Sequence, residues 1–199
     1  MKVAVFGKKY ENNIEEFLIN LRSMLLKNGI MDEQIDTSYF DTDIDSDYEN
    51  TQKRFNSIKK TIFSSDVLII ESSCKSEGIS FVTGFALALN KPTLILYDKT
   101  VRTDIRSLST ILLGTKALKR AFLKKYSLKD QQEFDDIVCN FLKEANGLIE
   151  SKFYIILPPE INRYLEWWSY ENRRPKVNKI RELLNRDLSE NSEWNDFIK

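Results

Sequence analysis

Polar side chains able to do chemistry follow an apolar run in the middle of the chain. Glu71 ends the run Val67 to Ile70, and Ser76 and Glu77 follow a few residues later. A carboxylate at the end of a buried strand is costly unless it is paired or used, so Glu71 is a candidate catalytic group. Ser76 stands where a helix is expected to begin, and free N–H groups there favour an anion. The alternatives are a helix cap for Ser76 and an ordinary surface position for Glu77.

Further candidates follow two other apolar runs. Gly7, Lys8 and Tyr10 come after the first run of the chain, and Asp98 comes after the run Thr93 to Tyr97. Open α/β sheets bind ligands at the carboxyl ends of their strands, so we expect these residues to lie near Glu71. Lys8 would attract phosphate, and Tyr10 has a ring suited to stacking. The alternative for Lys8 is a solvated surface lysine.

Composition excludes several kinds of site. The chain has 199 residues with 30 basic and 30 acidic side chains, no histidine and two cysteines, Cys74 and Cys139. Histidine-based catalysis is therefore ruled out, and two thiols cannot complete a zinc site. The alternating acids from Asp41 to Asp47 lack the glycine and closing glutamate of a calcium loop. We expect no metal and no cofactor.

The elements that must position these residues alternate along the chain. Apolar strand patterns and amphipathic helix patterns follow one another and predict a doubly wound parallel sheet covered by helices, in an α/β domain over residues 1–149. The chain has no apolar run long enough to cross a bilayer, so we expect a cytoplasmic protein without membrane contact. The expected strands are Lys2–Phe6, Ile35–Phe40, the run from Asp66 and Thr93–Tyr97; the expected helices are Asn13–Lys27, Tyr48–Phe63, a short one after Ser76, and about Leu128–Ala145, which Asn146-Gly147 is expected to end.

The last part of the chain, residues 151–199, has a different pattern. A short strand at Lys152–Leu157 is followed by Pro158-Pro159 and by helices at Glu160–Tyr170 and Lys176–Leu188. So short a segment cannot enclose a core alone. We therefore expect a homo-oligomer, at least a dimer, assembled through this module.

The large domain resembles the nucleoside 2-deoxyribosyltransferases and related nucleotide N-glycosidases. The resemblance rests on residues from the end of the central strand to a Lys-Pro pair, which are Glu71, Ser76, Gly78, Phe81, Gly84, Ala86, Lys91 and Pro92. It implies a nucleoside or nucleotide ligand, with Ser76 at the 5′ group, and the first loop at the base and sugar. Val82 stands where the family has its nucleophilic glutamate.

The C-terminal module resembles the ribbon-helix-helix domain over residues 152–188. The Leu-Pro-x-Glu opening and the stretch Ile180 to Leu184 carry the resemblance. It implies an intertwined dimer that reads DNA, and assembly without DNA binding is the alternative. The DNA-contacting residues would be Lys152, Tyr154, Arg173, Arg174 and Lys176, although Tyr154 and Ile156 depart from the polar residues that usually read bases.

Three hypotheses about function follow. The first is a nucleotide-binding sensor, scaffold or regulated effector that lacks the usual nucleophile. The second is an active N-glycosidase or deoxyribosyltransferase that uses Glu71 or Glu77. The third is a DNA-binding regulator. The pairing of these two domains also suggests an effector of a bacterial phage-defence or toxin system, by analogy only.

Overall fold

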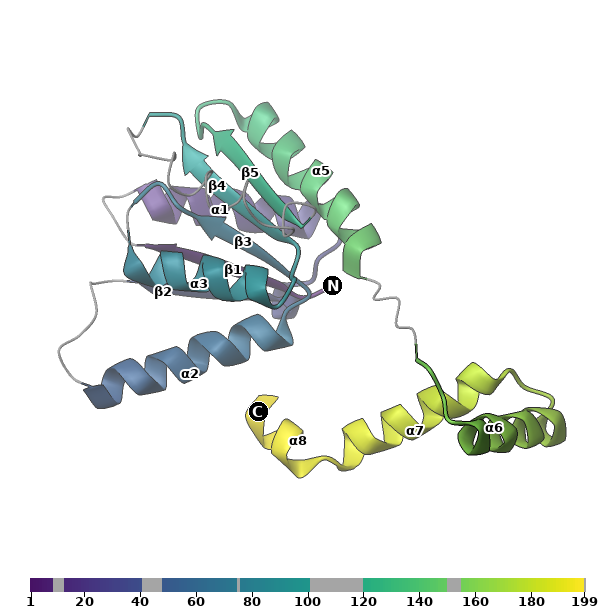
Figure 1. Ribbon diagram of the computed structural model, residues 1–199. Coiled ribbons are helices and arrows are strands. Elements are labelled where there is room, and N and C mark those ends of the chain that lie inside the picture. The colour runs from purple at the N-terminus through teal and green to yellow at the C-terminus, as the bar shows by residue number, and fades with distance from the viewer. Residues whose placement is uncertain (9–12, 41–47, 75, 101–119, 150–154, 199) are drawn as a thin grey trace. The chain divides into compact units, whose positions relative to one another are not determined.

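The computed structural model describes residues 1–8, 13–40, 48–74, 76–100, 120–149 and 155–198. The chain divides into two compact units, residues 1–150 and 151–199, here called the N-terminal and C-terminal units. Figure 1 shows the strands and helices of each. Within the described residues no helix is long and apolar enough to cross a membrane.

The N-terminal unit is an α/β domain with a sheet of five parallel strands. The strand order is β2-β1-β3-β4-β5, so the chain reverses its direction of winding between β1 and β3. The elements in chain order are β1 (Val3–Lys8), α1 (Asn13–Lys27), a short 3-10 helix η1 (Asp32–Gln34), β2 (Ile35–Phe40), α2 (Tyr48–Ser64), β3 (Val67–Glu71), α3 (Glu77–Ala88), β4 (Thr93–Asp98), β5 (Ala121–Tyr126) and α5 (Gln131–Ile149). The expected parallel α/β arrangement is confirmed, and ligands of such sheets bind where the winding reverses.

Each face of the sheet carries its own apolar core, because alternate strand residues point to opposite faces. On the first face, Val5, Ile69 and Leu96 pack with α1 and α5. On the second face, Phe6 and Leu68 pack with α2 and α3. Both layers can be followed in Figure 1. β3 is buried along its whole length, which explains its unbroken apolar sequence.

The end of α5 differs from the expectation. Asn146-Gly147 does not end the helix, which continues to Ile149. The reason is burial, since an apolar stripe that includes Phe141, Leu142 and Ala145 packs on the first core and Ile149 is half-buried against it. This packing outweighs the roughly 1 kcal/mol that a glycine costs inside a helix.

The start of α5 also differs, by three residues from the expected Leu128. The side chain of Asp130 accepts a hydrogen bond from the Glu133 N–H at 3.0 Å, and its carbonyl accepts one from the Phe134 N–H at 3.1 Å. Asp130 therefore caps the first turn and fixes the start at Gln131.

The C-terminal unit contains α6 (Pro159–Asn172), α7 (Lys176–Glu190) and α8 (Ser192–Ile198). Both helices expected from the sequence are present. Of the strand expected at Lys152–Leu157, residues 155–157 have no regular secondary structure, and 152–154 lie outside the described residues. A ribbon needs a neighbouring strand, and the expected neighbour belongs to a second chain. The ribbon therefore stays a prediction.

Candidate functional site

Glu71 is the last residue of β3 and one of the most deeply buried charged residues of the described chain, with 1% of its surface exposed. Alternation along the strand places it on the first face, together with Ile69. Its Oε1 atom accepts hydrogen bonds from the Ser73 N–H at 3.1 Å, from the Ser73 hydroxyl and from the Tyr126 hydroxyl at 3.2 Å. One carboxylate oxygen therefore has three donors.

Ser73 extends this network to the end of β4. The Asp98 N–H donates to Ser73 Oγ at 2.7 Å, while Ser73 donates to Glu71. The strand register places Asp98 beside Tyr126. Three neighbouring strand ends are thus joined by Glu71, Ser73, Asp98 and Tyr126, which we call the strand-end cluster.

Glu71 Oε2 is the unusual atom of the cluster. It is buried and accepts no hydrogen bond from the described residues. Burial raises the pKa of the Glu71 carboxyl; the hydrogen bonds from Ser73 and Tyr126 oppose this effect, and the nearby charge of Asp98 adds to it. A buried acceptor without a partner is unfavourable. It is therefore suited to a ligand that supplies an N–H or O–H group.

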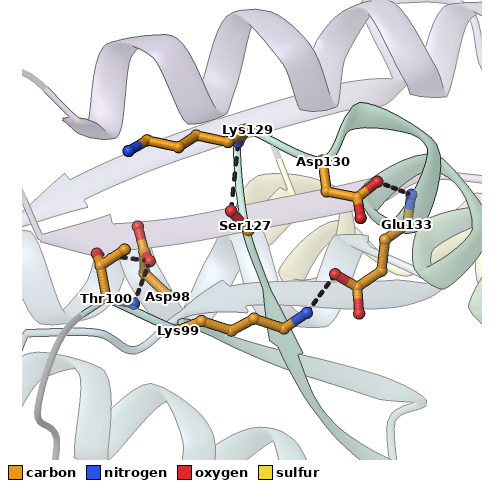
Figure 2. Close-up of polar contacts among 7 residues, drawn as sticks. All are labelled: Asp98, Lys99, Thr100, Ser127, Lys129, Asp130 and Glu133. Carbon is orange, nitrogen blue, oxygen red and sulfur yellow. Dashed lines mark hydrogen bonds and ion pairs between the residues drawn. The ribbon is translucent and has the colours of Figure 1, made fainter.

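Asp98 offers a second acceptor at the same edge. Only 6% of the residue is exposed, and its Oδ1 atom accepts hydrogen bonds from Thr100 N–H at 2.7 Å and Thr100 Oγ at 2.8 Å. Figure 2 shows this contact. These bonds hold the carboxylate in place at the end of β4.

The residues that follow β4 and β5 fix this edge of the sheet. Lys99 forms an ion pair with Glu133 of α5, and the Lys129 N–H donates to Ser127 Oγ at 3.3 Å. Together with the Asp130 cap, these contacts tie the start of α5 to the end of β4 (Figure 2). Asp98 and Glu133 lie on β4 and α5, and the other residues of these contacts lie in the turns that follow β4 and β5.

Gly7 lies directly beside Glu71. A Cβ atom at position 7 would lie 2.8 Å from Ile14 Cδ1 and 3.5 Å from Glu71 Cβ. The first distance is too short, so a side chain there would displace Ile14 of α1. Gly7 thus allows close packing at the strand end where the winding reverses. Lys8, the next residue, is half-buried, and Tyr10 lies outside the described residues.

The start of α3 lies on the other face of the sheet. Ser76 precedes the helix, but its side chain makes no capping hydrogen bond, and Glu77 is exposed in the first turn. Gly78 is half-buried. Among the described residues, no hydrogen bond or ion pair joins Glu77 to the strand-end cluster.

Val82 is fully buried, at 0% exposure. It packs in the second core with Ile79, Leu68 and Ile70. Glu71 points to the opposite face. Position 82, where the resemblance would place a nucleophilic glutamate, therefore holds a residue of the apolar core.

The candidate DNA-contacting residues are only partly described. Lys152 and Tyr154 lie outside the described residues, whereas Arg173 and Arg174 are exposed in the turn before α7. Lys176 Nζ is 2.9 Å from Glu166 Oε1 and donates to Asn162 Oδ1 at 3.0 Å. Lys176 is therefore already engaged within its own unit.

A groove of about 590 Å³ between β5 and α5 is a separate feature. Its lining includes Phe122 and Phe141, with acidic residues around them. Asp130 caps α5, Glu133 pairs with Lys99, and Asp136 accepts a hydrogen bond from Gln132. These acids have structural partners. Within the described residues no group of three metal-ligating side chains gathers anywhere.

Ser73 and Tyr126 were not among the residues that the sequence suggested. Tyr126 is 55 positions from Glu71. Its only local signal is its place at the end of the last strand. Ser73 stands two residues after Glu71, which ends a buried strand. This spacing is the sequence feature that could have identified Ser73 as a partner of Glu71.

Comparison with known proteins gives no family. No protein-family model matches the chain, and no curated protein matches it. Among solved structures, it is similar to the translation elongation factor SelB from Methanococcus maripaludis in complex with the GTP analogue GppNHp, with a TM-score of 0.43 and 13% identity over 72% of this chain and 34% of that one. It is also similar to a conserved protein from Enterococcus faecalis V583, with a TM-score of 0.41 and 12% identity over 70% of this chain and 99% of that one. The match thus spans about a third of the elongation factor.

Proposed function

We propose that the N-terminal unit is a binding domain for a nucleoside or nucleotide and that it acts as a sensor, scaffold or regulated effector. The observation that carries the proposal is Glu71 Oε2, a buried acceptor without a partner among the described residues, at the ligand-binding edge of a doubly wound sheet. Sugar hydroxyls and base amino groups are donors of the kind it lacks. The resemblance to nucleoside-processing enzymes supports the choice of ligand class.

The burial of Val82 supports binding without the family's covalent chemistry. A nucleophile must reach the anomeric carbon of the sugar. Val82 has no nucleophilic atom and is enclosed in the second core. Hence we expect little or no release of free base from ordinary nucleosides or their monophosphates.

The test is thermal unfolding with a panel of nucleosides and nucleoside monophosphates, using Glu71→Gln and Glu77→Gln as matched variants. At a ligand concentration of a hundred times Kd, the native chain should gain about 2.7 kcal/mol. Glu71→Gln should lose this gain, because an amide N–H replaces the acceptor at Oε2. Glu77→Gln should keep it, because Glu77 is exposed. If no member of the panel stabilises the native chain, the proposal is wrong.

An active N-glycosidase is the second candidate, and one observation favours it. Glu71 and Asp98 are two carboxylates at one strand edge, and burial raises the pKa of Glu71. Two neighbouring carboxyl groups in different environments are typical of acid/base pairs. In that case Glu71 would give its proton to the leaving base as the bond between base and sugar breaks. Water would attack the anomeric carbon and give its proton to the Asp98 carboxylate. Chromatography would then show free base from the native chain and none from Glu71→Gln.

DNA binding by the C-terminal unit has weaker support. Arg173 and Arg174 are exposed, but Lys176 and Lys179 are paired with Glu166 and Glu182. An electrophoretic mobility shift that Arg173→Ala and Arg174→Ala remove would favour the regulator hypothesis. The pairing of two such domains suggests, by analogy, an effector of a bacterial defence system.

A further inference from the structure

The side-chain donors of the strand-end cluster are already engaged inside it. The hydroxyl groups of Ser73 and Tyr126 both donate to Glu71 Oε1, and so does the Ser73 N–H. The Asp98 N–H donates to Ser73 Oγ at 2.7 Å. What this cluster offers to a ligand is therefore carboxylate oxygen, which can only accept a hydrogen bond while it is ionised.

Two carboxylate oxygens of the cluster have no donor among the described residues. The first is Glu71 Oε2, which is buried. The second is Asp98 Oδ2, because the N–H and the hydroxyl of Thr100 both donate to Oδ1, at 2.7 and 2.8 Å (Figure 2). These two bonds also fix the orientation of the Asp98 carboxylate. The site thus presents one acceptor from the end of β3 and one from the end of β4.

The two carboxylates lie on the same face of the sheet. Glu71 pairs with Leu96 in the register of β3 and β4, and Asp98 lies two residues beyond Leu96. Leu96 belongs to the first core, so alternation along β4 places Asp98 on the face of Glu71. Neighbouring strands are about 4.8 Å apart. Burial raises the pKa of Glu71 and the charge of Asp98 raises it further, as expected of neighbouring carboxylates.

We propose that the strand-end cluster binds the 2′- and 3′-hydroxyl groups of a ribose, so that the ligand carries ribose and not 2-deoxyribose. This inference rests on the nucleoside-binding function proposed above. The two hydroxyl groups are donors on adjacent carbon atoms, and one can meet each carboxylate. Phosphate oxygens are acceptors and carry negative charge, so a phosphate group is a poor match for two carboxylates.

A 2-deoxyribose matches the cluster less well. It lacks the 2′-hydroxyl group and would leave one of the two acceptors without a donor. Glu71 and Asp98 are 1% and 6% exposed, so water cannot readily replace the missing group, and an unpaired buried acceptor is unfavourable. The resemblance to nucleoside 2-deoxyribosyltransferases favours the deoxy sugar instead. The count of donors and acceptors and the resemblance therefore lead to opposite predictions.

The experiment compares matched sugars on the native full chain. Adenosine, guanosine, cytidine and uridine are each titrated in a calorimeter beside their 2′-deoxy and 3′-deoxy forms. For the base that binds, we expect each deoxy form to have a Kd about 10- to 100-fold higher than the ribose form, because it loses one hydrogen bond to a carboxylate. Equal or tighter binding of the 2′-deoxy form would overturn the inference and leave the proposed function standing. If no ribose or deoxy form binds, the proposed function fails as well.

Two variants test whether Asp98 is the source of the discrimination. Asp98→Asn keeps Oδ1 as the acceptor for Thr100 and replaces Oδ2 with an N–H group. The preference for ribose over one of the two deoxy forms should then fall to near onefold, because that hydroxyl group has lost its acceptor. Glu77→Gln is the control and should keep both preferences, since Glu77 is exposed. A folded Asp98→Asn variant that keeps both preferences would contradict the inference, and the comparison on the native chain decides the question if this variant does not fold.

Discussion

At the scale of single residues, the strand-end cluster combines satisfied and unsatisfied acceptors. Glu71 Oε1 has three donors, while Oε2 has none among the described residues. A protein rarely keeps a buried carboxylate in this state for stability alone, because the charge costs free energy. Strained or costly groups of this kind concentrate at functional sites. This is why the site is centred on Glu71.

Burial of the charged Glu71 carboxylate is unfavourable, and this should make the free energy of unfolding depend on pH. The folded pKa is raised, so the folded chain holds this proton more tightly than the unfolded chain does. Stability from this group is complete below the unfolded pKa and is lost as pH rises through the folded pKa, at about 1.4 kcal/mol for each unit of separation. Glu71→Gln should therefore gain stability relative to the native chain as pH rises from the unfolded pKa of Glu71 through its raised folded pKa.

Chemical denaturation at several pH values would check this expectation. Glu77→Gln is the control, because that carboxylate is exposed and pays no burial cost. If the difference in free energy of unfolding between Glu71→Gln and the native chain is the same at all pH values, burial does not destabilise the charged form of Glu71.

Val82 gives a prediction about packing. Val82→Ala should lower the free energy of unfolding by about 2 kcal/mol, because it removes two buried methyl groups from the second core. Val82→Glu places a carboxylate in the same apolar surroundings and should destabilise the chain far more, without producing base release. Thermal unfolding and chromatography measure the two effects. A folded Val82→Glu variant that releases base would show that this position still faces substrate.

At the scale of elements, packing determines where a helix ends when the sequence pattern is ambiguous. Four of the five strands and the first helices followed from apolar periodicity, and the helix Asn13–Lys27 has the expected bounds. No strand was expected by its residues where β5 lies. The end of α5 did not, because Asn146-Gly147 resembles a helix stop in isolation. Only the contacts of Ala145 and Ile149 with the first core show why the helix continues.

The sequence pattern predicted only part of the candidate site as well. Glu71 and Asp98 were predictable, since each ends an apolar strand and carries a carboxylate. Tyr126 was not, because its contact with Glu71 depends on the order of β3, β4 and β5 and on the register of Asp98 with Tyr126. A linear sequence carries no direct signal of that register. Ser73 depends on the path of the loop after β3.

Gly147 offers a direct test of the longer helix. It lies exposed within α5, and no heavy atom lies within 4 Å of the place where a Cβ would be added. Gly147→Ala should therefore raise the free energy of unfolding by about 0.5–1 kcal/mol. Gly29→Ala is the contrasting variant. Gly29 has φ of 80°, a backbone conformation that alanine rarely adopts, so this substitution should lower the free energy of unfolding. Denaturant unfolding would compare them, and a destabilised Gly147→Ala would mean that the helix ends earlier.

At the scale of the whole molecule, the two units differ in how they are stabilised. The N-terminal unit has a core on each face of its sheet. Among its described residues, the C-terminal unit buries Leu165 and Trp168 and exposes many of its other large hydrophobic residues. The first unit is therefore expected to be stable alone and the second to depend on association.

A chain shortened to residues 1–150 tests this division. It should stay folded, because it keeps both cores. It should have the mass of one chain in light scattering, because the expected assembly module is gone. It should also retain stabilisation by the ligand of the strand-end cluster. Loss of cooperative thermal unfolding in the shortened chain would contradict the independence of the first unit.

The raised pKa of Glu71 also has a thermochemical consequence. A ligand that donates to Oε2 favours the charged carboxylate, despite the neighbouring Asp98, and lowers the pKa that burial had raised. At a pH between the two values, binding must then expel a proton into the buffer. The heat of binding would change with the ionisation enthalpy of the buffer, so titration calorimetry in buffers of different ionisation enthalpy would count the protons that leave this one carboxyl group.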